Sequence, residues 1–316
     1  MKSLVSVIIP MYNSQLYIER CISSILTQTY DQVEILVVDD GSIDNSADII
    51  KKIQQENGKL KYFYQQNSGP GMARNKAIQE SKGKYLLFVD ADDYLSEDYI
   101  ECMVESAEMN KSELVVAGYT LAYADARKQV QVVPEKYEKN VAEEWVYRIS
   151  ACCSRLYLKE FWLRNSLEFN EEKGARAEDV PIALYSNAMA RNISIVKNAG
   201  YFYYQHQESA MHQKKKVIFQ FPYRSFSEMY QKVKKQSFHN SEAYFNIGVI
   251  KFLAQFAFSI YRKADLEEKK RFKEYVEELL QEDWTAIIAE WKMYRRRIQF
   301  PILHKIAIEL FLLKYK

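Results

Sequence analysis

The sequence predicts an α/β protein whose central sheet is mostly parallel, followed by a helical C-terminal region. Over roughly the first 120 residues, short runs of Val, Ile and Leu alternate with segments of helical period. Strands of this kind, separated by helices, are typical of a parallel sheet that is covered on both faces. From about residue 214 the apolar residues recur at helical spacing, which predicts a helical appendage.

The alternation defines the expected elements in chain order. The expected strands are "VSVIIP" (5–10), "EILVVDD" (34–40), "KLKYFYQQ" (59–66), "KYLLFVD" (84–90) and "ELVVAGY" (113–119). The expected helices between them are "YIERCISSILTQT" (17–29), "SADIIKKIQQEN" (46–57), "GPGMARNKAIQESKG" (69–83) and "SEDYIECMVESAEM" (96–109). "AEEWVYRISACCSRLYLKEFWLRN" (142–165) has a helical or mixed pattern, and amphipathic helices are expected at 221–236, 243–264 and 266–284. We expect one domain over 1–213, in halves of about 1–120 and 121–213, and the appendage over 214–316.

The composition excludes several classes of protein. The 316 residues include 44 Lys and Arg against 42 Asp and Glu, a formal net charge of +2, so no nucleic-acid partner is expected. Four cysteines without a CxxC pair or a zinc-type His spacing indicate reduced thiols and a cytoplasmic protein. The first apolar run alternates with Ser and ends at Pro10, which fits a strand better than a signal peptide. No apolar run reaches the 18 residues that would predict a membrane-spanning helix.

Polar side chains follow three of the expected strands. In chain order they are Tyr12 and Asn13, then Asp39 and Asp40, then Asp90, Asp92 and Asp93. Because parallel α/β sheets bind ligands beyond the carboxyl ends of their strands, we expect these residues at one site. Neighbouring carboxylates repel one another and resist burial, which favours a cation or water among them.

The segment "FVDADD" (88–93) has a D-x-D spacing. At a strand end, Asp90 and Asp92 can point to one side, where one accepts from a ribose hydroxyl and the other binds Mg²⁺ or Mn²⁺. The alternative is an ordinary acidic first turn of the next helix. An EF-hand is excluded because its sixth position, which requires Gly, is Leu95.

Two further segments have features of a nucleotide site. Asp39 and Asp40 can accept from a base N–H, although helix capping explains part of the polar segment that follows them. Gly69 and Gly71 precede Arg74 at a helix start, and backbone N–H groups with a guanidinium can bind a diphosphate. A dinucleotide-binding G-x-G-x-x-G is excluded, because this turn follows the third strand.

Together, "SVIIPMYN" (6–13), "ILVVDDGSIDNS" (35–46), "GPGMARNKAI" (69–78) and "LLFVDADD" (86–93) resemble glycosyltransferase family 2, whose catalytic domain has the GT-A fold. The resemblance covers roughly residues 3–120. Downstream, "ARAEDVPIALY" (175–185) is similar to the Glu-Asp motif of the family. "YFYYQHQESAMH" (201–212) is more loosely similar to the segment that follows, with Glu208 where Gly is usual.

The resemblance implies a nucleotide-sugar site. Pro10 and Tyr12 would contact the base through the backbone and by stacking, and Asp40 would accept a base N–H. Arg74 would lie on the phosphate side and Asp90 would bind the ribose. The full expected set is Pro10, Tyr12, Asn13, Asp39, Asp40, Arg74, Asp90 and Ala91.

The resemblance also implies a cation and a general base. Asp92 would bind Mn²⁺ or Mg²⁺, and His212 or, less specifically, His206 would be a further metal ligand, with a surface histidine as the alternative. Asp179 of the Glu-Asp pair would take the proton from the acceptor hydroxyl. Taken alone, "AEDV" would be an ordinary helix start before Pro181.

These expectations describe an inverting glycosyltransferase. The implied donor is a UDP-hexose such as UDP-galactose, UDP-glucose or UDP-GlcNAc, and the implied acceptor is a growing glycan on a lipid carrier or a surface glycoprotein. A sugar nucleotidyltransferase would need a Gly-rich, Arg-containing loop after the first strand, where this chain has "PMYNSQ". A non-catalytic partner subunit with the same fold is the remaining alternative, although both acidic motifs are retained.

The C-terminal segment "EWKMYRRRIQFPILHKIAIELFLLKYK" (290–316) combines an apolar stripe with basic residues. The stripe comprises Ile302, Leu303, Ile306, Leu310 and Leu313, and the basic residues are Arg295, Arg296, Arg297, Lys305, Lys314 and Lys316. A basic amphipathic helix can lie in the headgroup region of an anionic membrane, where a lipid-linked acceptor would be found. The alternative is packing on the domain or within a homo-oligomer.

Overall fold

The structure is a computed structural model that describes residues 2–125, 128–133, 151–170, 178–206, 221–235, 242–280, 284–294 and 308–312. The chain forms two compact units that alternate along the sequence. The first unit comprises Met1–Tyr137, Ala151–Lys173 and Ala190–Gln213. The second comprises Glu138–Ser150, Gly174–Met189 and Lys214–Lys316. The boundary expected after residue 213 stays a prediction.

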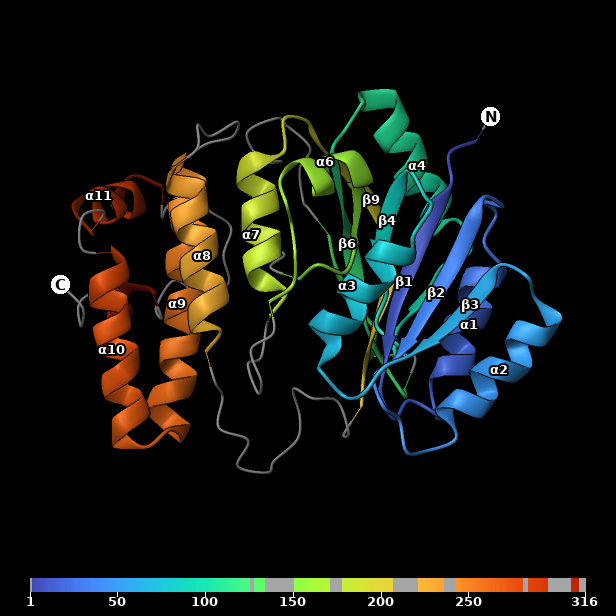
Figure 1. Cartoon of the computed structure of the whole chain (residues 1–316). Coiled ribbons are helices and arrows are strands. Elements are labelled where there is room, and N and C mark those ends of the chain that lie inside the picture. The colour runs from blue at the N-terminus through green and yellow to red at the C-terminus, as the bar shows by residue number, and fades with distance from the viewer. Residues whose placement is uncertain are drawn as a thin grey trace. The chain divides into compact units, whose positions relative to one another are not determined.

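The first unit is built on one sheet, to which the described residues contribute nine strands (Figure 1). They are β1 (Val5–Met11), β2 (Val33–Asp39), β3 (Leu60–Tyr64), β4 (Tyr85–Phe88), β5 (Tyr94–Leu95), β6 (Leu114–Tyr123), β7 (Val130–Val132), β8 (Arg155–Leu158) and β9 (Ile193–Gln205). The strand order is β3-β2-β1-β4-β8-β6-β9-β5, and β7 pairs with β6. The predicted α/β class is confirmed.

The sheet is parallel at its β3 end and mixed beyond β4. β1 is parallel to β2 and to β4, and β2 is parallel to β3. β8 runs antiparallel to both of its neighbours, whereas β9 is parallel to β6. The chain leaves β1 toward β2 and β3 and then returns to β4 on the other side of β1. This reversal is a topological switch point, the place where open α/β sheets bind ligands.

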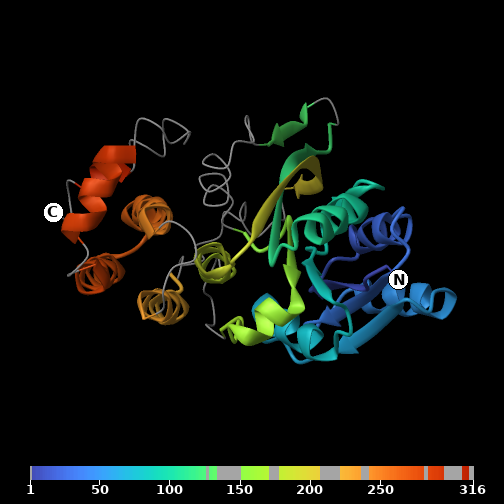
Figure 2. The same cartoon turned by 90° about the horizontal axis from the view of Figure 1, so that it is seen from above.

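Helices cover both faces of the sheet. Those of the first unit are α1 (Ile18–Leu26), α2 (Ser46–Glu56), α3 (Pro70–Glu80), α4 (Tyr99–Asn110) and α6 (Lys159–Arg164). α3 and α6 lie over one face, and α1 and α4 lie over the opposite face (Figure 2). Because both faces are covered, β1 and β2 are buried along their whole length, which explains their mainly apolar sequences.

An aromatic cluster fixes the end of β4. Its members are Phe88, Tyr157, Trp162 and Phe169. The ring centroids of Tyr157 and Trp162 are 5.2 Å apart with an interplanar angle of 89°, the edge-to-face geometry that aromatic pairs favour. Phe88 is fully buried at the last position of β4. The strand end that precedes Asp90 is therefore held by packing on the α3 and α6 side.

The described residues of the second unit are helical. They form α7 (Val180–Met189), α8 (Tyr223–Lys234), α9 (Glu242–Lys263), α10 (Leu266–Leu280) and α11 (Trp284–Tyr294). The buried ring of Phe221 lies 5.0–5.6 Å from the rings of Phe252, Phe256, Phe272 and Tyr275. The aromatic residues of these segments thus form a core, and the predicted helical C-terminal region is confirmed.

The far C-terminus lies mostly outside the described residues. Within 308–312, Ile308 and Phe311 are buried, and Trp291 Nε1 donates to Glu309 Oε1 at 2.9 Å. The basic residues and most of the apolar stripe of the expected amphipathic helix are not among the described positions. In the described part of the chain, no helix is both long and apolar enough to cross a bilayer.

Candidate active site

The acidic segment 90–93 forms a turn at the switch point, between β4 and β5. Val89 extends β4 by donating its backbone N–H to the Ile8 carbonyl at 3.0 Å. Asp93 N then donates to the Asp90 carbonyl, also at 3.0 Å, which closes a four-residue turn. The three carboxylates therefore follow directly from a buried strand, and each of them has a different partner.

Asp90 pairs with Arg74 of α3. Arg74 is 4% exposed and its Nη2 donates to Asp90 Oδ1 at 2.9 Å. The guanidinium also lies 5.3 Å from the centroid of the Phe169 ring. Two residues that the sequence assigned to ribose and phosphate binding are thus in direct contact. Arg74 is nearly buried, so its contact with a phosphate would require a ligand that enters beside Asp90.

Asp92 pairs with His206, which follows β9. His206 Nε2 lies 2.9 Å from Asp92 Oδ2, and His206 Nδ1 lies 3.1 Å from the Tyr17 hydroxyl. Burial, and then the neighbouring charge of Asp90, raise the pKa of Asp92, while the His206 contact opposes the shift. His206 was the weaker of the two histidine candidates in the sequence; His212 lies outside the described residues.

Asp93 is the buried member of the turn, with 1% of its surface exposed. Its Oδ2 accepts from the Tyr201 hydroxyl at 2.6 Å, and its Oδ1 accepts from the Tyr204 backbone N–H at 2.9 Å. Burial raises the pKa of Asp93, and the charges of Asp92 and Asp90 raise it further. Asp93 therefore ties β9 to the turn, which places His206 next to Asp92.

The second acidic pair, at the end of β2, is occupied by internal hydrogen bonds. Asp40 Oδ1 accepts from Gln65 Nε2 and from Ser68 N, and its Oδ2 accepts from Gly69 N, each at 2.8 Å. Gly69 has a φ of 93°, a left-handed backbone conformation that favours glycine. Asp40 thus shapes the loop that leads into α3. One lone pair of Oδ2 remains for a ligand N–H, so the base-binding role stays a prediction.

Asp39 is similarly engaged. It is 1% exposed, its Oδ1 accepts from Ser42 N at 2.8 Å, and its Oδ2 accepts from the Tyr62 hydroxyl at 2.7 Å. Burial and the hydrogen bond to Asp39 raise the pKa of Tyr62. These contacts hold β3 and the loop after β2 together.

The remaining expected nucleotide contacts are Pro10 near the end of β1, Tyr12 and Asn13 in the loop after it, and Ala91 in the acidic turn. Pro10 is buried, Ala91 is 6% exposed and Tyr12 is 50% exposed. Asn13, with a φ of 48°, accepts from Ile43 N at 2.9 Å through its Oδ1. Asn13 therefore joins the loops that follow β1 and β2, and it leaves the neighbouring Tyr12 ring accessible.

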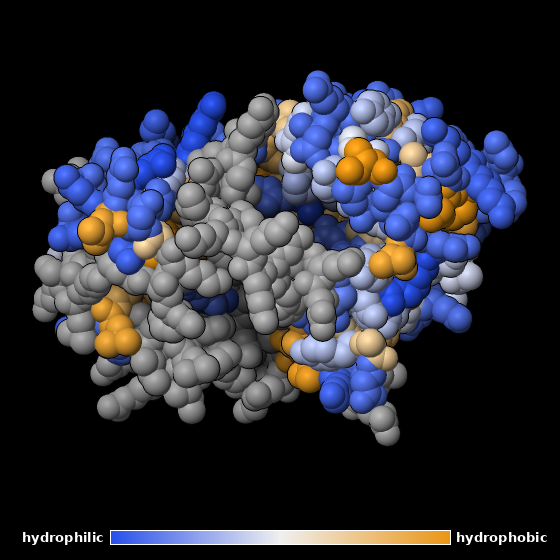
Figure 3. All heavy atoms as spheres, turned by 90° about the horizontal axis from the view of Figure 1, so that it is seen from below, coloured by the Kyte–Doolittle hydropathy of each residue, from blue (hydrophilic) through white to orange (hydrophobic). Residues whose placement is uncertain are grey.

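The face at the carboxyl ends of β1, β2 and β4 is the one seen from below in Figure 3, where the first unit is mainly hydrophilic with separate hydrophobic spots. Large side chains that are exposed at or after the ends of β1, β2 and β3 include Tyr12, Leu16, Ile43 and Tyr64. Exposed aromatic rings and carboxylates at the ends of the same strands suit a ligand with a flat base and a charged group.

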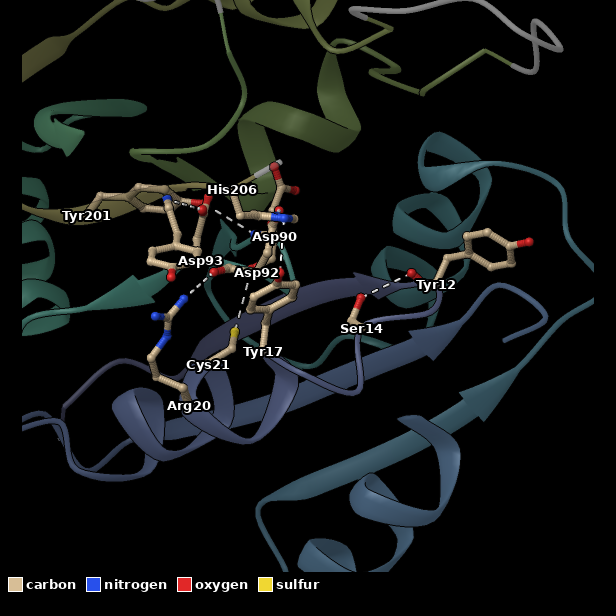
Figure 4. Close-up of polar contacts among 11 residues, drawn as sticks. Tyr12, Ser14, Tyr17, Arg20, Cys21, Asp90, Asp92, Asp93, Tyr201 and His206 are labelled. Atoms are coloured by element: carbon tan, nitrogen blue, oxygen red, sulfur yellow. Dashed lines mark hydrogen bonds and ion pairs between the residues drawn. The ribbon is translucent and has the colours of Figure 1, made fainter. Parts of the chain in front are cut away.

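The structure adds residues that the sequence interpretation did not select. Three side chains point toward the acidic turn from α1 and its N-cap, namely Tyr17, Arg20 and Cys21 (Figure 4). Tyr201 faces the same turn from β9. Cys21 Sγ donates to the Asp90 carbonyl at 3.6 Å, and burial raises the pKa of this thiol. In the sequence these positions are indistinguishable from the packing face of an amphipathic helix.

Asp179, the expected base, lies just before α7 in the second unit. Its backbone carbonyl accepts from Ala183 N at 3.0 Å, which is the first hydrogen bond of that helix. The acidic turn belongs to the first unit. The assignment of Asp179 as a base therefore rests on its sequence motif.

The acidic turn has the donor set of a small divalent-cation site. Mg²⁺ is commonly bound by one or two carboxylates together with substrate phosphates and water, and Mn²⁺ also accepts oxygen ligands of this kind. Within the described ranges, no group of three or more His, Cys, Asp and Glu side chains could hold a metal ion by itself. Asp92 and His206, whose side chains are 2.9 Å apart, are therefore two candidate ligands, and the remaining ligands would have to come from a substrate or water.

The sheet order, the switch point between β1 and β4 and the acidic turn define an α/β domain of the GT-A fold. Residues 6–162, about half of the chain, match the sequence family described as Glycosyl transferase family 2. The chain belongs to this family.

Relatives and solved structures agree with this assignment. EpsH and EpsJ of Bacillus subtilis, both named as glycosyltransferases, are 29% and 32% identical over 231 and 215 residues, or 68% and 65% of this chain. The matches span 65% and 62% of those relatives, less than two thirds of each. The structure of S. aureus TarS 1-349 in complex with UDP-GlcNAc superposes with a TM-score of 0.72 at 22% identity, covering 98% of this chain and 92% of that one.

Proposed function

We propose that the protein is an inverting glycosyltransferase that transfers a hexose from a UDP-sugar to a hydroxyl group of a glycan. The observation that carries the proposal is the acidic turn 90–93, which lies at the switch point of a family 2 domain with Arg74 and His206 on its carboxylates. UDP-galactose, UDP-glucose and UDP-GlcNAc are the proposed donors. The UDP-GlcNAc complex of the TarS structure supports a UDP-linked donor.

In this proposal the chain's own residues hold the two ends of the donor. The exposed Tyr12 ring stacks on the base, and Asp40 accepts a base N–H through its remaining lone pair. Asp90 accepts from the ribose, while Arg74, which already contacts Asp90 at 2.9 Å, balances the charge of the diphosphate. The remaining proposed contacts with the nucleotide sugar are Pro10, Asn13, Asp39 and Ala91.

Asp92 and His206 would hold a Mn²⁺ or Mg²⁺ ion. When bound, such a cation neutralises charge on the departing diphosphate. His206 fits the role because the Tyr17 hydroxyl, 3.1 Å from Nδ1, can either donate or accept and so supports both tautomers of the ring. Mn²⁺ is favoured over Mg²⁺ if His206 is a ligand, since Mg²⁺ prefers oxygen. A role of His212 stays a prediction.

Asp179 is the proposed general base, which takes the proton from the acceptor hydroxyl as it attacks the anomeric carbon. A positioned base contributes about 10² to 10⁴-fold to the rate. Asp179→Asn should therefore lower kcat by about 10² to 10⁴-fold with little change in UDP affinity. Pre-steady-state turnover and calorimetric UDP binding measure the two quantities. Loss of UDP binding with kcat retained at saturation would assign Asp179 another role.

The acceptor is proposed to be a growing glycan on a lipid carrier or a surface glycoprotein. The basic C-terminal segment would then contact an anionic membrane surface. Alternatively, the apolar stripe of this segment would pack within a homo-oligomer. A cytoplasmic location at the inner face of the membrane fits this acceptor. Truncation after Gln299 followed by liposome co-sedimentation separates the two uses.

Hydrolysis of a panel of nucleotide sugars tests the proposed function directly. Purified protein is incubated with UDP-, GDP-, CMP- and dTDP-linked sugars in Mn²⁺ or in EDTA, and the release of nucleotide is measured. We expect release from one or a few UDP-hexoses that requires Mn²⁺. Release from a donor with another base, or equal release in EDTA, would overturn the corresponding part of the proposal.

A further inference from the structure

One face of α1 forms a row of hydrogen bonds with residues 90–100, the segment that contains the acidic turn. The row continues to Gln28, just after the helix. The Cys21 thiol and Arg20 donate to the carbonyls of Asp90 and Asp92. Further along, Ser24 Oγ accepts from Leu95 N at 3.1 Å, and Gln28 accepts from Ile100 N at 2.9 Å and donates to the Ser96 carbonyl. These positions recur every three or four residues, as neighbours on one helix face do. α1 therefore supports the turn from beneath.

Arg20 is the most constrained of these contacts. Its Nη2 donates to the Asp92 carbonyl at 2.7 Å. Its guanidinium carbon lies 4.4 Å from the Tyr94 ring centroid and 4.1 Å from the Tyr204 ring centroid. A planar guanidinium held near two aromatic rings loses little freedom when it donates. Arg20 of α1 thus contacts the acidic turn, β5 and β9. Its contact in the turn is the backbone of Asp92, whose carboxylate faces His206.

Two explanations for such an arginine predict opposite effects on cation binding. If Arg20 acted only through its positive charge, it would repel a divalent cation at Asp92, and its removal would tighten cation binding. If Arg20 acts by holding the Asp92 backbone in place, its removal would let the carboxylate move, and cation binding would weaken. The short contact to a carbonyl, rather than to a carboxylate oxygen, supports the second explanation.

We propose that Arg20 is a positioning residue that fixes the Asp92 carboxylate for a divalent cation through the Asp92 carbonyl. This inference rests on the proposed function, because it assumes a cation at Asp92. The two rings hold the guanidinium, and the guanidinium holds the backbone from which the metal-binding side chain projects.

Mn²⁺ binding in the presence and absence of UDP tests the proposal, with free Mn²⁺ followed by electron paramagnetic resonance. Arg20→Met should weaken Mn²⁺ binding about ten-fold, the effect of losing one charged hydrogen bond. Arg20→Lys keeps the charge but not the planar fork, so its affinity should fall between those of Arg20→Met and the wild type. Tyr94→Leu removes one ring without touching an acid, and should weaken binding in the same direction.

Arg164→Met serves as the matched control, because Arg164 of α6 pairs with Glu113, just before β6, rather than with a residue of the acidic turn. This variant should bind Mn²⁺ as the wild type does. Tighter binding by Arg20→Met, with Arg20→Lys unchanged, would overturn the positioning role and leave the proposed function standing. A wild-type protein that binds no Mn²⁺ with or without UDP would overturn both. Circular dichroism melting verifies that each variant is folded before it is titrated.

Discussion

Two acidic clusters stand at the carboxyl ends of β2 and β4, a pair and a group of three, and they have different partners. Asp39 and Asp40, after β2, receive donors from their own side of the sheet, among them Gln65, Ser68 and Gly69. The carboxylates after β4 contact Arg74 of α3, Tyr201 of β9 and His206 just after β9, and they also repel one another. Hydrogen bonds occupy most of the acceptor capacity of Asp39 and Asp40, whereas the three acids after β4 retain mutual repulsion.

The difference shows where a carboxylate cluster has capacity for a ligand. Because Asp40 already accepts hydrogen bonds from three donors, it has little acceptor capacity left for a cation. In the turn 90–93, burial and neighbouring acids raise the pKa values of Asp92 and Asp93, which indicates that ionisation there is unfavourable without an added positive charge. A cation at Asp92 would relieve the repulsion between these carboxylates. The acidic turn, which is electrostatically unfavourable in the isolated protein, is therefore suited to bind a metal ion with its substrate.

The largest effect should come from Asp92. Asp92→Asn keeps the shape and the contact with His206 but removes the charge, so metal-dependent turnover should fall by about 10³-fold or more, as expected when a metal site that stabilises a leaving group is lost. Glu97→Gln, which neutralises an exposed carboxylate nearby, is the matched control. Nucleotide release from the UDP-sugar measures both. Full activity of Asp92→Asn, or of the wild type in excess chelator, would contradict a cation at this residue.

Replacement of Asp40 should act on stability instead. Asn offers one acceptor oxygen where Asp40 now serves three donors, so Asp40→Asn should lower the free energy of unfolding by about 3 kcal/mol. Urea denaturation measures this change, with Glu97→Gln again as the control. If stability were unchanged and only UDP affinity fell, Asp40 would act as a direct base contact rather than as a loop support.

The smallest effect is a dependence of stability on pH in EDTA. Because the folded state raises the pKa of Asp92, protonated Asp92 favours folding. That stabilisation is complete below the ordinary Asp range and is lost as the pH rises through the raised pKa. Asp92→Asn cannot ionise, so its stability relative to the wild type should increase as the pH rises from the ordinary Asp range through the raised pKa.

Glu34 provides a control of opposite sign at the other end of the strands. Burial opposes its ionisation, but hydrogen bonds from Lys61, Ser6 and the Lys82 backbone outweigh burial and lower the pKa of Glu34. Its stabilisation is therefore present above the ordinary Glu pKa and is lost as the pH falls through the lowered value. Glu34→Gln should be most destabilising near pH 7 and least so in acid. Equal pH profiles for the two variants would contradict the electrostatic difference between the two ends of the sheet.

The parallel half of the fold was predictable because its signals are local. β1, β2 and β4 are mainly apolar runs, and a helix of 3.6-residue period follows each of β1, β2 and β3. β8 was interpreted as part of a helical or mixed segment because it has only four residues and its alternation is too short to recognise. β9 contains Lys197, Asn198 and Gly200 within a 13-residue strand, and its register against β6 shifts in that region. The resulting pattern is not the simple alternation of a half-buried strand.

The site was predictable as a location but not as a set of contacts. The acids at the strand ends follow from the spacing of the motifs. Their partners do not, because His206 lies 114 residues from Asp92 and Tyr201 lies 108 residues from Asp93 in sequence. Arg20 occupies a helical position whose neighbours Ile18 and Ile22 are core residues, and only the folded sheet shows which side of α1 meets the turn.

The calorimetric affinity for UDP, measured with Mn²⁺ and again with EDTA, tests the central claim that Asp92 binds a cation together with a nucleotide diphosphate. For the wild type, Mn²⁺ should strengthen UDP binding about ten-fold or more, because a cation bridged between a carboxylate and a diphosphate adds favourable interactions with both. Asp92→Asn should lose that gain and bind UDP equally in both conditions. Equal affinity of the wild type with and without Mn²⁺, or the same gain in Asp92→Asn, would contradict the account.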